Sequence, residues 1–255
     1  MSKETWRSSP EFVMRPANRR GDVFSCLVPV RRYGCGRRRM KGSSTIDRFA
    51  FERELWQRGI TLVAGVDEAG RGPWAGPVVV SAVMLPGRWL RSGLPPGLEG
   101  LNDSKQLTAR QRERFFEVLI GCAEVKFALA RMEAEQVDEF NILQATHRAM
   151  NEALAQLVPS PQHALVDGAR VKFLAFPQTA LVQGDARSYS IAAASVLAKV
   201  TRDRLMLEYD ERWPAYGFAE HKGYGTARHR AALAKHGLCP IHRRSFAPVR
   251  QPELF

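Results

Sequence analysis

The sequence predicts an α/β protein, because short apolar segments with strand character alternate with longer segments of helical spacing. The strand-like segments 61–66 and 77–85 lie close together and are separated by the turn-rich sequence DEAGRGPWAG. Two later apolar segments each end in an Asp beside a Gly, and a long helical segment follows them. We therefore expect an α/β domain whose strands lie side by side in one sheet.

Local signals define the other elements in the order of the chain. Thr108 with Gln111 three positions later resembles a capping box, which predicts a helix from that point. We expect further strands at 125–130, 164–166 and 180–182, and helices at 141–157, 190–213 and 226–236. Pro214 is placed to stop the long helix and Gly237 to end the last one.

The composition of the 255-residue chain is that of an ordinary globular protein. The longest apolar run, 77–85, is far shorter than the roughly 20 residues of a membrane-spanning helix, so we expect no membrane partner. The stretch 23–30 lacks the flanking features of a signal peptide. The four cysteines, without a repeating spacing, suit a reducing compartment, and we expect a cytoplasmic protein.

Most of the net charge of +12 lies at the N-terminus. Residues 1–41 hold 11 Lys or Arg and three acidic residues, so only four of the positive charges remain for the rest of the chain. A basic balance favours an anionic partner such as nucleic acid. We expect residues 1–45 to form a disordered basic arm, with Met40 as an alternative start of translation.

Four carboxylates lie at the ends of apolar strands: Asp67 and Glu68 end the first, Asp167 ends another and Asp185 follows a third. Strand ends of the same polarity meet at one sheet edge, and clustered carboxylates suit Mg²⁺ or Mn²⁺. Two such ions can activate water and stabilise the leaving oxygen in phosphodiester hydrolysis. Each Asp taken alone is equally an ordinary turn residue. Glu68 can share a site with Asp67 only if the backbone bends, since side chains alternate across a strand.

Two other functional sites are suggested by the glycines and by the C-terminal histidines. Gly70, Gly72 and Ala75 satisfy a dinucleotide-binding pattern, but a strand-like segment follows them where that motif needs a helix. His236, Cys239 and His242, with His229 as a fourth ligand, suggest a zinc site, although surface histidines are the preferred interpretation.

The assembled motifs resemble ribonuclease HII, the bacterial type 2 ribonuclease H. They are GVDEAGRGPWAGPVVVSAV at 65–83, NDSKQL at 102–107, VDG at 166–168, SIAAASVLAKVTRD at 190–203, HKGYGT at 221–226 and HRRSF at 242–246. The resemblance covers about residues 50–248. It implies an RNase H-like fold with a mixed central sheet flanked by helices. It also implies a catalytic domain at 46–212 and a C-terminal helical region at 213–248 that closes over the nucleic acid.

The resemblance also implies an activity and its residues. The expected reaction is hydrolysis of RNA in RNA:DNA hybrids and incision of DNA on the 5′ side of an embedded ribonucleotide, leaving a 3′-hydroxyl and a 5′-phosphate, as in ribonucleotide excision repair. Asp67, Glu68, Asp167 and Asp185 would be the catalytic metal ligands. Gly70, Arg71 and Gly72 would read the ribose 2′-hydroxyl, Tyr224 would pack on the following sugar, and Ser104, Lys105, Lys199 and Lys222 would contact phosphates. Asp203 is assigned a structural or electrostatic role.

Several points stay open at this stage. Gln183 stands where the family commonly has lysine, and Trp74 where it has an aliphatic residue. The alternative function is a catalytically inactive protein that binds RNA:DNA hybrids. Gln251, Leu254 and Phe255 in the terminal QPELF resemble the peptide that docks bacterial proteins on the DNA sliding clamp. We expect a monomer.

Overall fold

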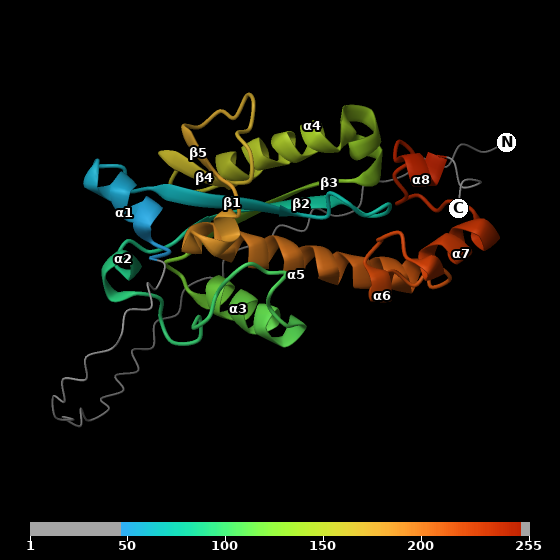
Figure 1. The fold of residues 1–255 in the computed structure, drawn as a ribbon, viewed down its shortest axis with the longest axis horizontal. Coiled ribbons are helices and arrows are strands. Elements are labelled where there is room, and N and C mark those ends of the chain that lie inside the picture. Colours follow the sequence, from blue (N-terminus) through green and yellow to red (C-terminus); the bar gives the residue numbers. More distant parts are fainter. Residues whose placement is uncertain (1–46, 251–255) are drawn as a thin grey trace, which may run out of the picture. The chain divides into compact units, whose positions relative to one another are not determined.

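A computed structural model describes residues 47–250 (Figure 1). The basic arm, Met40 and the clamp-binding positions Gln251, Leu254 and Phe255 lie outside the described residues. The described residues fall within one compact unit.

Five strands form one mixed sheet in the order β3-β2-β1-β4-β5. They are β1 (Val63–Ala69), β2 (Val78–Met84), β3 (Lys126–Met132), β4 (His163–Asp167) and β5 (Gln178–Leu181). Neighbouring strands among β1, β2 and β3 are antiparallel, whereas β4 is parallel to both β1 and β5. The predicted α/β fold with a mixed sheet is confirmed.

Helices cover both faces of the sheet, with α4 on one side and α3 and α5 on the other (Figure 1). The helical elements are α1 (Ala50–Gln57), α2 (Trp89–Ser92), α3 (Ala109–Gly121), α4 (Ala134–Ala155), the 3-10 turn η1 (Gly184–Ala186), α5 (Tyr189–Arg212), α6 (Phe218–His221), α7 (Ala227–His236) and α8 (Ala247–Arg250). All seven residues of β2 are buried. Val80 and Ala82 belong to the core under α4, and Val83 belongs to the core under α3 and α5, as strand alternation requires.

The capping box predicted for α3 is present. The Thr108 side chain accepts a hydrogen bond from the Gln111 backbone N–H, and the Gln111 side chain accepts one from the Thr108 N–H. Because two otherwise unpaired backbone donors are satisfied in this way, the helix begins where the sequence predicts.

The predicted start of α4 at Asn141 is wrong, because the helix begins at Ala134 behind a second capping box formed by Glu133 and Gln136. Asn141 has a non-helical backbone (φ 65°), and its side-chain oxygen accepts hydrogen bonds from the N–H groups of Leu143 and Gln144. Asn141 is therefore the N-cap of a second helical segment inside α4. This internal cap explains why the sequence predicts a helix start at Asn141.

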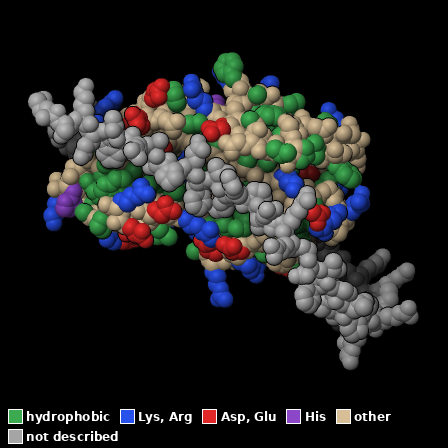
Figure 2. Space-filling view, turned by 180° about the vertical axis from the view of Figure 1, so that it is seen from behind, with side chains coloured by type: hydrophobic (Ala, Val, Ile, Leu, Met, Phe, Trp, Pro, Cys, Tyr) green, Lys and Arg blue, Asp and Glu red, His purple; other side chains and the backbone are tan. Residues whose placement is uncertain are grey.

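The C-terminal helices pack on the far end of α5. Met206 and Tyr209 of α5 share a core with Phe218 of α6 and Leu233 of α7. Within the described part of the chain, no helix is long and apolar enough to cross a membrane. On the face seen in Figure 2, the described acidic and basic side chains are interspersed, in keeping with the modest net charge outside the arm.

Candidate metal centre

Asp67, Asp167 and Asp185 form one cluster. One oxygen atom from each side chain lies within 4.8 Å of the others. Within residues 47–250, this cluster is the one set of three or more His, Cys, Asp or Glu side chains close enough to share a metal ion. Parallel pairing of β1 with β4 and of β4 with β5 places the ends of these strands beside one another. The convergence of these aspartates at one sheet edge is therefore as predicted.

Backbone donors hold all three carboxylates, and the Asp67 Oδ1 accepts a hydrogen bond from the Glu68 N–H at 2.7 Å. The Asp167 Oδ1 accepts a hydrogen bond from the Gly184 N–H at 2.6 Å, which ties the end of β4 to η1. The Asp185 Oδ1 accepts one from the Ala186 N–H at 2.9 Å. A side chain at Gly65 in β1 would place its Cβ 2.1 Å from the carbonyl carbon of Ser190, so only glycine lets α5 begin this close to the sheet.

Glu68 lies beside this cluster without being one of its three clustered ligands. The strand expected at 61–66 runs further, since β1 pairs regularly with β2 through Asp67, Glu68 and Ala69. Only the parallel ladder with β4 ends earlier, at Val66. The Glu68 carboxylate forms an ion pair with Arg71 at 3.2 Å instead of joining the three aspartates. A metal-binding role for Glu68 stays a prediction.

The electrostatics of the cluster favour a bound cation. Burial, followed by the charges of Glu68 and Asp167, raises the pKa of Asp67 well above its usual range. Burial, followed by the charges of Asp167 and Asp103, raises the pKa of Asp185 to about 6. Three oxygen ligands that repel one another when ionised are a donor set suited to Mg²⁺ or Mn²⁺, whose charge removes that repulsion.

Two site residues were missed by sequence reasoning. Asp103 lies close enough to Asp185 to share a side-chain hydrogen bond. A side-chain hydrogen bond with Ser195 of α5 lowers the pKa of Asp67, and the Ser195 Oγ lies 2.8 Å from the Oγ of Ser104. Asp103 lies in NDSKQL and Ser195 in SIAAASVLAKVTRD, but neither adjoins an apolar strand, which is the signal that points to the four predicted carboxylates.

The Gly-Arg-Gly segment and Tyr224 lie together beside the cluster. A Cβ added to Gly72 would lie 3.7 Å from the Cε1 of Tyr224. The Tyr224 side chain is 49% exposed, so its alternative role as a core residue is excluded. Trp74 joins this arrangement through its backbone, which donates a hydrogen bond to Gly223 O and accepts one from Arg243 N–H. An aromatic face and an exposed glycine therefore border the same surface.

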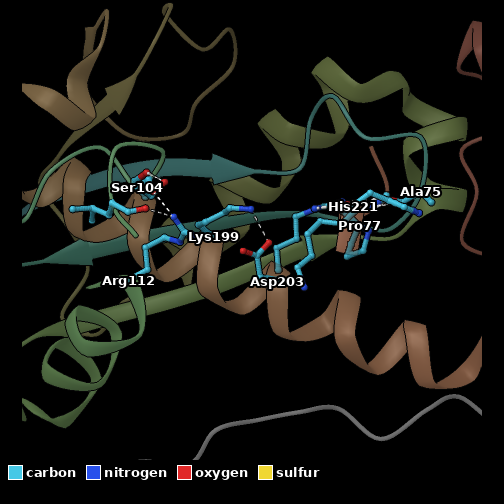
Figure 3. A network of polar contacts seen from close by, with 12 residues as sticks. Ala75, Pro77, Ser104, Arg112, Lys199, Asp203 and His221 are labelled. Atoms are coloured by element: carbon cyan, nitrogen blue, oxygen red, sulfur yellow. Dashed lines mark hydrogen bonds and ion pairs between the residues drawn. The ribbon is translucent and has the colours of Figure 1, made fainter. Parts of the chain in front are cut away.

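The four residues expected to contact phosphates differ in their surroundings. Burial lowers the pKa of Lys105, but Asp103 and the three clustered aspartates raise it by more, so this lysine lies close to the metal centre. Lys199 forms an ion pair with Asp203 at 2.7 Å, drawn in Figure 3, which agrees with an electrostatic role for Asp203. Lys222 is half-buried, with a lowered pKa caused first by that burial. Ser104 is buried and its hydroxyl is bonded to Ser195.

The chain that carries this site matches a known protein family. The family model for ribonuclease HII matches residues 64–249. The chain belongs to the ribonuclease HII family. A ribonuclease HII of Geobacillus thermodenitrificans is 53% identical over 79% of this chain and 74% of its own length.

Two solved structures extend the family likeness to the fold. Ribonuclease H2 of Pyrococcus horikoshii has a TM-score of 0.62 at 29% identity, covering 75% of this chain and 97% of its own. RNase HII of Archaeoglobus fulgidus, solved in complex with PCNA, has a TM-score of 0.59 at 27% identity, covering 71% of this chain and 93% of its own. The RNase H-like fold implied by the motifs is thus shown, and the protein is a metal-dependent endoribonuclease of this family.

Both rival interpretations fail. The glycine segment leads into β2 and not into a helix, so it does not form a dinucleotide-binding turn. His236 is exposed, as the surface interpretation expects. The surface interpretation is wrong for His229 and His242, because both are buried. Their ring nitrogens bond to each other and to the backbone.

Proposed function

We propose that this protein hydrolyses the RNA strand of RNA:DNA hybrids and cuts DNA on the 5′ side of embedded ribonucleotides, leaving a 3′-hydroxyl and a 5′-phosphate. The observation that carries the proposal is the cluster of Asp67, Asp167 and Asp185 in a chain of the ribonuclease HII family. Ribonucleotide excision repair in the cytoplasm is the setting that this activity would serve.

The protein's residues divide the work as follows. The three aspartates, with Glu68 beside them, would hold Mg²⁺ or Mn²⁺, which when bound supplies a Lewis acid for water and for the leaving oxygen. Lys105 lies next to these carboxylates and is suited to contact a backbone phosphate. No nucleophile from the protein is required.

Selection of ribonucleotides would come from the surface formed by Gly70, Arg71, Gly72 and Tyr224. The 2′-hydroxyl is the group that distinguishes ribose from deoxyribose, and exposed backbone without side chains allows close approach to it. Tyr224 presents an exposed ring next to Gly72, placed to pack on a neighbouring sugar. Lys199, Lys222 and Ser104 are proposed as further phosphate contacts, and the helices in 213–248 as the cover over the nucleic acid.

The terminal QPELF, through Gln251, Leu254 and Phe255, is proposed to bind the DNA sliding clamp. Support comes from the similar archaeal protein that was solved in complex with PCNA. Loss of clamp binding in the Leu254→Ala, Phe255→Ala variant would agree with the proposal, whereas equal affinity of both forms would contradict it. We propose that the protein acts as a monomer.

The deciding experiment measures cleavage of a duplex DNA that contains a single ribonucleotide. The reaction is run in the presence of Mg²⁺, of Mn²⁺ or of a chelator. We expect incision 5′ to the ribonucleotide only with metal. Asp67→Asn should lower the rate by roughly 100-fold or more, because even residues behind metal ligands matter by about 10- to 100-fold. Glu117→Gln, an exposed acidic residue on α3, is the matched control and should cut normally. Tight binding without incision by the wild type would instead establish the inactive hybrid-binding protein.

A further inference from the structure

Two arginines are buried behind the Gly-Arg-Gly segment without a counter-charge. Arg202 and Arg243 are 1% and 0% exposed. Within residues 47–250 neither forms an ion pair with a carboxylate. Burying an unpaired charge is costly, and stability alone would favour an apolar residue of similar size. Their presence calls for a reason other than stability.

Arg243 bonds only to backbone carbonyls of one loop. It donates to Gly70 O at 2.6 Å, Arg71 O at 3.0 Å, Pro73 O at 2.9 Å and Gly76 O at 2.9 Å. The planar guanidinium, with five donors in a fixed fork, is the side chain that can hold four carbonyls at once.

Arg202 extends the same arrangement to the segment that carries Tyr224. It donates to Pro77 O, Ala75 O and Lys222 O at 3.0 to 3.1 Å. Figure 3 shows Ala75, Pro77 and His221 gathered along α5 beyond the Lys199–Asp203 ion pair. A Cβ on Gly70 would lie 2.1 Å from the Arg202 Nε, so the first glycine of the segment is required by the buried arginine.

The peptide groups held by Arg243 determine where two N–H groups point. The 70–71 and 71–72 peptides are trans, so each N–H lies opposite the carbonyl that Arg243 holds. Within the described part of the chain, the N–H groups of Arg71 and Gly72 donate to no other residue, and both residues are exposed. A cation bonded to a carbonyl also polarises the attached N–H and makes it a better donor.

We propose that Arg243 is a positioning residue for ribose selection, because it aims and polarises the backbone N–H groups of Arg71 and Gly72 toward the 2′-hydroxyl. Arg202 supports it by joining this loop to the Tyr224 segment. The inference rests on the proposed function, in which these glycines read the ribose.

The test compares affinity for a duplex with one ribonucleotide and for the same duplex in all-DNA form, in an Asp67→Asn background that prevents cleavage. Arg243→Lys should lower the ratio of the two affinities by roughly 10-fold, which is the effect expected from losing well-directed hydrogen bonds. The change should come mainly from weaker binding of the ribonucleotide duplex. Arg244→Lys, an exposed neighbour, is the matched control and should leave the ratio unchanged.

An unchanged ratio in a folded Arg243→Lys protein, or an equal loss on both duplexes, would overturn the proposal. If this variant does not fold, amide NMR of the Asp67→Asn protein decides instead. The Arg71 and Gly72 amide signals should shift with the ribonucleotide duplex and not with the all-DNA duplex. Equal responses to both duplexes would refute the inference. Wild-type cleavage, measured separately, shows whether the proposed function itself holds.

Discussion

The Asp67 carboxylate is supported by a hydroxyl from a distant part of the chain. A side-chain hydrogen bond with Ser195 lowers the pKa of Asp67, and the Ser195 Oγ lies 2.8 Å from the Ser104 Oγ in a buried pair. Replacing a side chain that orients a metal ligand typically lowers metal affinity by about 10- to 100-fold. The two serines therefore belong to the metal centre, although a direct phosphate contact was expected of Ser104.

Ser195→Ala should raise the Mg²⁺ concentration needed for half-maximal cleavage by about 10-fold, because Asp67 loses a donor that favours its ionised form. Titration of activity with Mg²⁺ measures this. Ser92→Ala, at the exposed end of α2, is the control and should behave as wild type. An identical Mg²⁺ dependence in Ser195→Ala would show that the hydroxyl does not act on the metal site.

Tyr224 offers a second test at the scale of one residue. Its ring, and not its hydroxyl, is expected to pack on a sugar, so Tyr224→Phe should cut a single-ribonucleotide duplex at close to the wild-type rate. Tyr224→Ala should cut it roughly 5-fold more slowly, since ring contacts of this kind contribute about 1 kcal/mol. A slow Tyr224→Phe variant would point to the hydroxyl instead.

At the scale of single elements, helix caps fix the segments that border the site. The capping box of α3 begins directly after the loop that carries Asp103 and Lys105. Arg112, in the first turns of α3, donates to Ser104 O at 2.9 Å and Leu107 O at 2.5 Å, and Figure 3 shows it close to Ser104. The start of this helix thus orders the loop that places Lys105 near the carboxylates.

Thr108→Ala should lower the free energy of unfolding by about 1 kcal/mol, as the loss of an N-cap side chain commonly does. Denaturant unfolding measures the change. Thr108→Ser keeps the oxygen that accepts from Gln111 and should lose much less. Equal stability of Thr108→Ala and wild type would mean that the cap contributes nothing in this context.

At the scale of the whole molecule, a buried histidine pair joins α7 to the segment that carries Arg243. His229 Nδ1–H donates to Tyr224 O at 3.0 Å, and His242 Nδ1 accepts from the Cys239 N–H at 3.0 Å. Only one proton then fits between the two Nε2 atoms, 3.0 Å apart, so His242 donates to His229 and both rings are neutral. Burial is the main cause that lowers the pKa of each to about 4.

This pair predicts acid sensitivity. In the unfolded chain a histidine has a pKa near 6.5, so between pH 6.5 and 4 the unfolded state binds more protons. The stabilising contribution is full above about pH 6.5 and is lost as the pH falls toward 4. Chemical unfolding across this range should show declining stability.

His229→Gln should be less stable at pH 7, by roughly 1 to 3 kcal/mol for the broken buried hydrogen bonds, and should depend less on pH. His236→Gln, which alters an exposed ring on the same helix, is the control and should keep the wild-type profile. A wild-type pH profile in His229→Gln would exclude the pair as the source of acid sensitivity.

The sequence by itself determined the α/β class, the capped start of α3, the end of α7 at Gly237 and the aspartates at one sheet edge. These features follow from local rules of periodicity, capping and strand ends, which need only neighbouring residues. Tertiary structure alone decided that Glu68 pairs with Arg71, that Ser195 reaches Asp67 and that His229 and His242 are buried together. It also revealed Arg243 behind the Gly-Arg-Gly segment. Apart from the Glu68–Arg71 ion pair, these contacts join residues distant in the chain. Their energies depend on burial and direction, which composition and spacing do not encode.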